Sequence, residues 1–110
     1  IATLFVDLAL SSPLVVPWTE GDGDGVAEAI VRHTGLTPSP LRYRGWLGLE
    51  CGRVGTAVWM MRALVTENVL ARREGTVLFV PINPWQDPDG RTVAAAVTRV
   101  ARDSAAPAQA

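Results

Sequence analysis

The sequence contains no lysine, and this absence excludes several classes of chemistry. All ten basic residues are arginines, beside eleven acidic residues and a net charge of −1. Without lysine, the chain cannot form a Schiff base, hold pyridoxal phosphate through an amine or build a phosphate loop that needs a lysine. The near-neutral charge also argues against binding of nucleic acid, whose phosphates need a clustered basic surface, and against a polybasic membrane anchor.

Cysteine, histidine and long apolar runs are also scarce. The single Cys51 cannot form an internal disulfide, and His33 has no second ligand at metal-binding spacing. The acidic, glycine-rich stretch at 20–25 lacks the final glutamate of a calcium loop. We therefore expect neither a metal nor a cofactor. No apolar run reaches the roughly 18 residues of a membrane span, and residues 1–10 lack a basic leader, so we expect a cytoplasmic location.

The length and residue patterns predict one compact domain over residues 1–103, followed by a frayed tail at 104–110. Alternating and helical periods predict, in order, a strand at 3–10, a helix at 26–34 ended by Gly35, a strand at 41–51, a helix at 53–68, a hairpin at 69–82 with its turn at Glu74–Gly75, and a last helix capped by Asp89 or Thr92. The predicted inward residues are Val26, Ala27, Ile30 and Val31 in the helix at 26–34, and Val93, Ala96, Val97 and Val100 in the last helix. This β-α-β-α-β-β-α order is typical of an α/β two-layer sandwich, with a small mixed sheet of about four strands and three helices packed mainly on one face.

The predicted helix at 53–68 is the most apolar element. Its residues Val54, Val58, Met61 and Val65 recur at helical spacing and predict a buried face. Trp59, Met60 and Leu64 widen the apolar stripe to more than half of the circumference. Because burying such a side chain stabilises the fold by about 1.5–3 kcal/mol, we expect a partner to cover the second face. Trp59 and Met60 are therefore candidate interface residues.

The predicted strand at 41–51 suggests where a ligand could bind. Alternation turns one set toward the core, comprising Leu41, Tyr43, Leu47, Leu49 and Cys51, and another set outward, comprising Arg42, Arg44, Trp46 and Glu50. Phe5, Asp7 and Arg72 are predicted to share this outer sheet face. Arginines bind carboxylates and phosphates through two parallel hydrogen bonds, and tryptophan offers a stacking wall. The candidate ligand-binding residues are Asp7, Arg42, Arg44 and Trp46.

Three interpretations of the outer face remain open: the interface of a symmetric dimer, a pocket for a small anionic metabolite, and a solvated face. We favour an association domain, either a homo-oligomer or the accessory subunit of an assembly, that also binds an anionic metabolite. The alternative is a small metal-free enzyme with Asp7, His33 or Glu67 as acid or base and Arg42 and Arg44 orienting an anionic substrate. Cys51 is predicted to be an inert core thiol, with a nucleophile as the alternative because a helix follows it.

Overall fold

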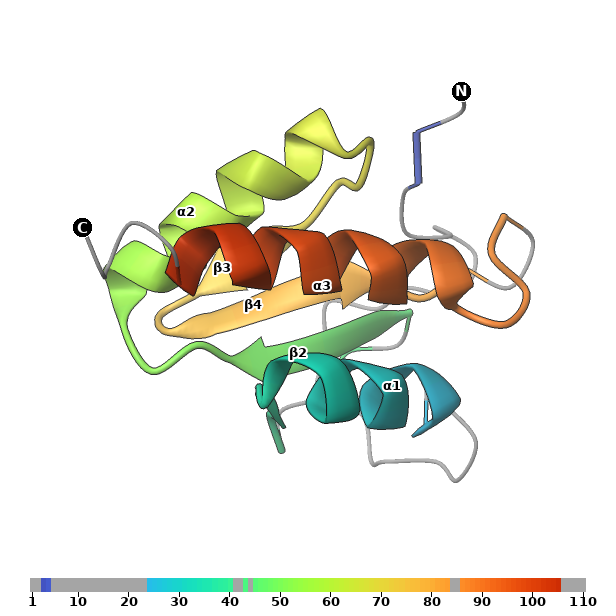
Figure 1. Cartoon of the computed structure of the whole chain (residues 1–110), viewed down its shortest axis with the longest axis horizontal. Coiled ribbons are helices and arrows are strands. Elements are labelled where there is room, and N and C mark those ends of the chain that lie inside the picture. The colour runs from blue at the N-terminus through green and yellow to red at the C-terminus, as the bar shows by residue number, and fades with distance from the viewer. Residues whose placement is uncertain (1–2, 5–23, 41–42, 44, 84–85, 106–110) are drawn as a thin grey trace.

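The computed structural model describes residues 3–4, 24–40, 43, 45–83 and 86–105, and this part of the chain forms three helices and a four-stranded sheet (Figure 1). The helices are α1 (Asp24–Thr34), α2 (Val54–Thr66) and α3 (Arg91–Ala105). The strands are β1 (Thr37–Pro38), β2 (Trp46–Glu50), β3 (Arg72–Glu74) and β4 (Val77–Pro81), in the sheet order β1-β2-β4-β3. The predicted α/β architecture and the predicted order of elements are confirmed.

All neighbouring strands of this sheet pair antiparallel. Among the described residues, a parallel pairing occurs at an isolated bridge between Leu4 and Val69. The Leu4 N–H donates to the Asn68 carbonyl at 2.6 Å, and the Leu4 carbonyl accepts from the Leu70 N–H at 2.9 Å. This bridge is the described part of the first predicted strand. The remainder, including Phe5 and Asp7, lies outside the described residues.

The hydrophobic core lies between one face of the sheet and the helices. α3 packs against both α1 and α2, and α2 packs on β4. Figure 1 shows α1 and α3 in front of β2 and β4. The predicted inward residues of α3 are all buried, as are the inward residues of the two central strands: Val93, Ala96, Val97, Val100, Leu47, Leu49, Leu78 and Val80. Each fully buried valine or leucine among them stabilises the fold by about 1.5–3 kcal/mol.

The prediction of which face of α2 is buried is wrong. Val54 and Val65 are 49% and 54% exposed, whereas Ala57, Met60 and Leu64 are buried, roughly 100° around the helix. α2 carries two apolar stripes, and it can turn only one of them toward the core. The buried stripe combines a small alanine with a flexible methionine, which adapts to irregular space. Val31 of α1, also predicted to face inward, is 41% exposed.

The predicted helix ends and hairpin are present, with one shift in register. Gly35 ends α1 at φ 76°, and Asn68 adopts φ 62° after α2. In the hairpin, Glu74 pairs with Val77, so the two-residue turn is Gly75–Thr76 instead of Glu74–Gly75. Gly75 has φ 59°, and glycine at the first turn position is typical of a type II′ turn. As a result, Glu74 is a strand residue.

The start of α3 is capped mainly by Asp87, which the sequence patterns did not single out. Its two carboxylate oxygens accept the backbone N–H groups of Thr92 and Val93, each at 3.0 Å. Asp89 accepts a longer bond of 3.3 Å from the Arg91 N–H. Because Asp87 is buried, it anchors the beginning of α3 to the preceding loop. Within the described part of the chain, no helix is both long and apolar enough to cross a bilayer.

Candidate functional site

The sheet face opposite the helices carries the candidate site. Strand pairing places Trp46 beside Pro81, and it places Phe79 between Gly48 and Arg72. Since side chains alternate along a strand, Trp46, Phe79, Arg72 and Glu74 share this outer sheet face. Phe79 is fully buried although the helices pack on the other face. Other side chains of the same chain therefore cover it.

Tyr43 is one of these covering residues, and its predicted position in the core is wrong. Its ring meets the Phe79 ring edge-on, with the centroids 5.2 Å apart and the planes at 67°. Gly45 has φ 83°, and the Trp46 N–H donates to the Tyr43 carbonyl at 3.0 Å. This turn interrupts the strand before β2 begins. The two-residue alternation therefore does not extend back from Leu47 to Tyr43.

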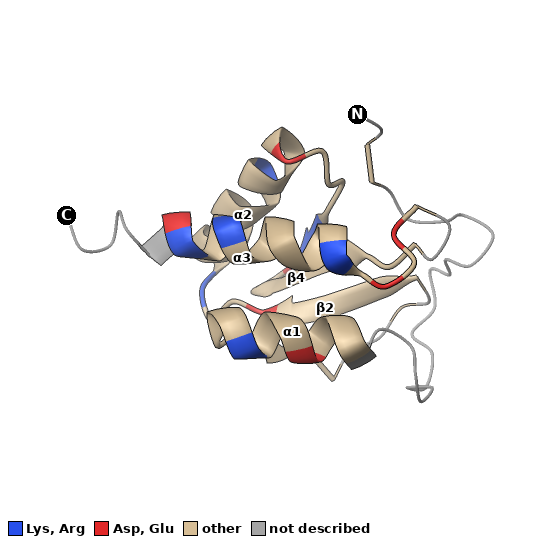
Figure 2. Cartoon of the chain, turned by 45° about the vertical axis from the view of Figure 1, so that its right-hand side comes forward, with Lys and Arg blue, Asp and Glu red and all other residues tan. Residues whose placement is uncertain are grey.

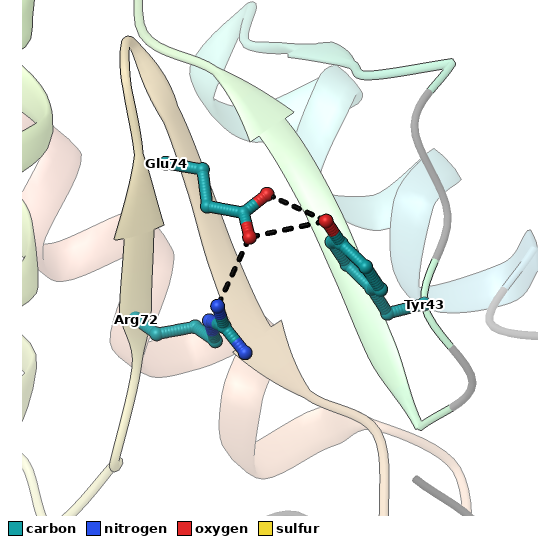
Figure 3. Close-up of polar contacts among 3 residues, drawn as sticks. All are labelled: Tyr43, Arg72 and Glu74. Carbon is teal, nitrogen blue, oxygen red and sulfur yellow. Dashed lines mark hydrogen bonds and ion pairs between the residues drawn. The ribbon is translucent and has the colours of Figure 1, made fainter. Parts of the chain in front are cut away.

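Tyr43, Trp46, Arg72 and Glu74 form a cluster above Phe79, which we call the outer-face cluster. Figure 3 shows Tyr43 and Arg72 both directed at the Glu74 carboxylate. The Tyr43 hydroxyl donates to the two carboxylate oxygens at 2.9 and 3.1 Å, and Arg72 Nη2 donates to Oε1 at 2.9 Å. The Arg72 guanidinium carbon lies 5.6 Å from the Tyr43 ring centroid and 5.9 Å from that of Trp46. The cluster thus positions one guanidinium by two rings and one carboxylate.

The charges of the outer-face cluster balance. The hydrogen bond to Glu74 and burial raise the pKa of the Tyr43 phenol, so Tyr43 remains the proton donor at neutral pH. Arg72 and Glu74 then sum to zero. The Arg72 side chain is 48% exposed, and Glu74 is its hydrogen-bond partner through one terminal nitrogen. Among the described residues, neither the other guanidinium nitrogens nor the Trp46 indole N–H has a hydrogen-bond partner.

The structure brings together only part of the predicted ligand site. Of the four predicted ligand-binding residues, Trp46 lies in the cluster, whereas Asp7, Arg42 and Arg44 lie outside the described residues. Arg72, which was predicted only to share the outer sheet face, also belongs to the cluster. Tyr43 and Glu74 were not predicted as site residues. The signal for Tyr43 was Gly45, since a glycine just before a strand can mark a turn.

The second candidate surface is the exposed side of α2, which we call the α2 surface and define by Val54, Trp59 and Val65. Trp59 is 38% exposed. Met60, the other predicted interface residue, is 1% exposed and lies in the core, so it offers no surface to a partner. Between its ends α2 carries one charged residue, Arg62, and Figure 2 shows the helix almost entirely uncharged.

Two of the three candidate acid or base residues, His33 and Glu67, lie in the helical layer, away from the outer-face cluster, and Asp7 lies outside the described residues. His33 is exposed in the last turn of α1. Glu67 ends α2 and forms an ion pair with Arg99 of α3 at 2.5 Å. The sheet separates both residues from Trp46 and Arg72. In the described part of the chain, no group of three or more histidine, cysteine or acidic residues could hold a metal ion.

Cys51 follows β2 and is partly buried, with its sulfur 4.0 Å from the Met60 sulfur. Burial of the thiol, and secondly the negative charge of Glu50, raise the pKa of Cys51 from an ordinary value of 9.0 to about 11. Glu50 keeps that charge because hydrogen bonds from the Thr76 side chain and the Gly52 N–H lower its pKa. This environment opposes a thiolate nucleophile.

We expect Cys51 to react with a thiol reagent at neutral pH about a hundredfold more slowly than a free cysteine, because only the thiolate reacts. The rate should rise with pH until about 11 and become ordinary in denaturant. The raised pKa stabilises the fold below pH 9, and this contribution is lost as the pH approaches 11. A rate that levels off near pH 7 would instead identify an activated thiolate.

Comparison of the chain with protein-family models, with curated proteins and with solved structures finds no match.

Proposed function

We propose that the chain is an association domain that pairs with a second copy of itself through the α2 surface and binds a small anionic ligand on its outer sheet face. The observation that supports pairing is the exposure of Val54, Trp59 and Val65 on a helix with one charged residue. Exposed apolar surface of this kind is typical of an interaction site when it is contiguous. Tryptophan in particular is enriched among the residues that dominate binding energy.

The low charge of α2 favours a second copy as the partner. In a two-fold dimer the same surface lies on both sides of the interface, so it must be complementary to itself. At 100° per residue, Arg62 lies between Val65 and Trp59 on this surface, which is otherwise uncharged, whereas a face rich in one charge would repel its own copy. Two α2 helices would then pack against each other at about 8–10 Å between axes.

Val65→Glu tests the pairing. We expect this variant to elute from a size-exclusion column as a smaller species than the unchanged chain, because each interface would have to bury two added carboxylates. Since Val65 is 54% exposed, the melting temperature of the subunit itself should change little.

Val31→Glu is the matched control, because it makes the same substitution at a valine of similar exposure, 41%, on α1. It should leave the elution volume unchanged. Equal behaviour of the two variants, whether both dissociate or neither does, would contradict pairing through α2.

The enzyme interpretation has less support. Glu67 is already paired with Arg99, and the raised pKa of Cys51 disfavours its thiolate. His33 and Glu67 belong to the helical layer, on the other side of the sheet from Trp46 and Arg72. A catalytic acid or base must reach the substrate within hydrogen-bond distance or through one water. Association and ligand binding therefore remain our proposal.

A further inference from the structure

Arg72 is held in place before any ligand arrives. Its guanidinium lies 5.6 Å and 5.9 Å from the Tyr43 and Trp46 ring centroids, and Glu74 binds one terminal nitrogen at 2.9 Å. Glu74 is in turn fixed by the Tyr43 hydroxyl. A flexible arginine loses side-chain entropy when it binds an anion, and this loss is smaller when the side chain is already ordered. The cluster therefore has the organisation of a recognition site.

The free donors of the cluster suit a planar anion beside a flat or apolar group. Arg72 retains N–H groups without a partner among the described residues, and it is half exposed. The partly exposed Trp46 ring lies beside this guanidinium, and its indole N–H also has no partner among the described residues. A guanidinium matches the two oxygens of a carboxylate, and an indole ring stacks on flat or apolar groups.

The charge balance selects the class of anion. Glu74 neutralises Arg72, so the cluster has no net charge to offset a second negative charge on a ligand. Inorganic phosphate carries on average more than one negative charge at pH 7, and its dianion would be repelled more strongly by Glu74 than a monoanion. We infer that the outer-face cluster is a recognition site for a monocarboxylate carried on a flat or apolar group. This inference rests on the anion-binding part of the proposed function and names its ligand class.

The test is a titration of the ¹⁵N-labelled chain with benzoate and, separately, with inorganic phosphate. Benzoate should shift the Trp46 indole N–H signal and the backbone amides of β3, and phosphate should shift them much less. Arg72→Gln should weaken benzoate binding by about ten- to hundredfold, the range for a lost hydrogen bond to a charged group. Arg32→Gln, which removes an exposed arginine from α1, should leave binding unchanged.

Glu74→Gln separates recognition from a purely structural role. The amide keeps an oxygen that can accept from Arg72 or Tyr43 but removes the competing negative charge. Benzoate should therefore bind about threefold more tightly or better, and phosphate should become a ligand. A cluster that only covers Phe79 would give variants with altered melting temperatures and unchanged affinity for benzoate.

The outcomes are distinguishable. If phosphate binds the unchanged chain as well as benzoate does, the ligand class is wrong while anion binding at this face stands. If neither anion shifts the Trp46 signal at about 50 mM, far above the concentration at which a small pre-organised site binds, the inference and the anion-binding proposal both fail. If Arg72→Gln and Arg32→Gln weaken binding equally, the site is not at the cluster.

Discussion

Gly90→Ala is expected to lower the free energy of unfolding by about 2–5 kcal/mol, a large part of the total for a domain of this size. A Cβ atom at Gly90 would lie 1.8 Å from Val26 Cγ2, because the start of α3 approaches α1 closely there. The backbone of Gly90 also has φ 72°. The left-handed conformation costs an alanine about 1–2 kcal/mol, and overpacking adds about 1–3 kcal/mol. Chemical denaturation of the unchanged chain and of the Gly90→Ala variant measures the difference in the free energy of unfolding.

Gly35→Ala is the control for the backbone contribution. Gly35 has φ 76°, but a Cβ atom there would meet no heavy atom within 4 Å. Gly35→Ala should lower the free energy of unfolding only by the cost of the left-handed backbone conformation, about 1–2 kcal/mol. Val26→Ala should partly relieve Gly90→Ala, since it removes the clashing methyl group. Equal losses for Gly90→Ala and Gly35→Ala would show that the close approach of α1 and α3 is absent.

Asp87→Ala is expected to destabilise the fold by about 2–3 kcal/mol. Its carboxylate accepts both the Thr92 and Val93 N–H groups, and the alanine variant would leave these donors without a partner at the start of α3. Loss of a helix cap costs about 0.5–2 kcal/mol, and a buried unsatisfied donor adds to this loss. Because α3 packs on both other helices, the transition should remain cooperative with a lower denaturation midpoint.

Asp89→Ala provides the matched comparison, since Asp89 lies two residues away and takes only a longer bond from Arg91 and an exposed ion pair with the same residue. Its removal should change the free energy of unfolding by about 0.5 kcal/mol or less. An Asp87 variant as stable as the Asp89 variant would show that Asp87 is not the cap.

The sequence was most informative where one element has one apolar face. In α3, the stripe of Val93, Ala96, Val97 and Val100 is buried as predicted, because the rest of the helix is polar or small. In α2 the periodicity fitted two stripes equally well, and tertiary packing selected Ala57, Met60 and Leu64. The exposed apolar residues of α2 now form the candidate interface. Predicting an apolar surplus on α2 was therefore possible, but predicting which residues carry it was not.

The candidate site depended on two local features that alternation does not report. The turn at Gly45 moved Tyr43 to the outer sheet face, and the one-residue shift of the hairpin turn made Glu74 a strand residue beside it. Trp46, predicted to face outward, does so because it belongs to the regular part of β2. A one-residue change in register moves every side chain of a strand to the opposite face of the sheet. A wrongly predicted strand end therefore gives wrong predictions for a site formed by residues at that end.

The molar mass of the unchanged chain in solution tests the central proposal most directly. Light scattering coupled to size-exclusion chromatography, at micromolar concentrations, should give twice the 11.7 kDa of one chain. Dilution should lower this mass toward that of a single chain, because an interface formed mainly by one pair of helices is small. A mass of 11.7 kDa at every concentration, with the α2 surface left in water, would contradict pairing through α2.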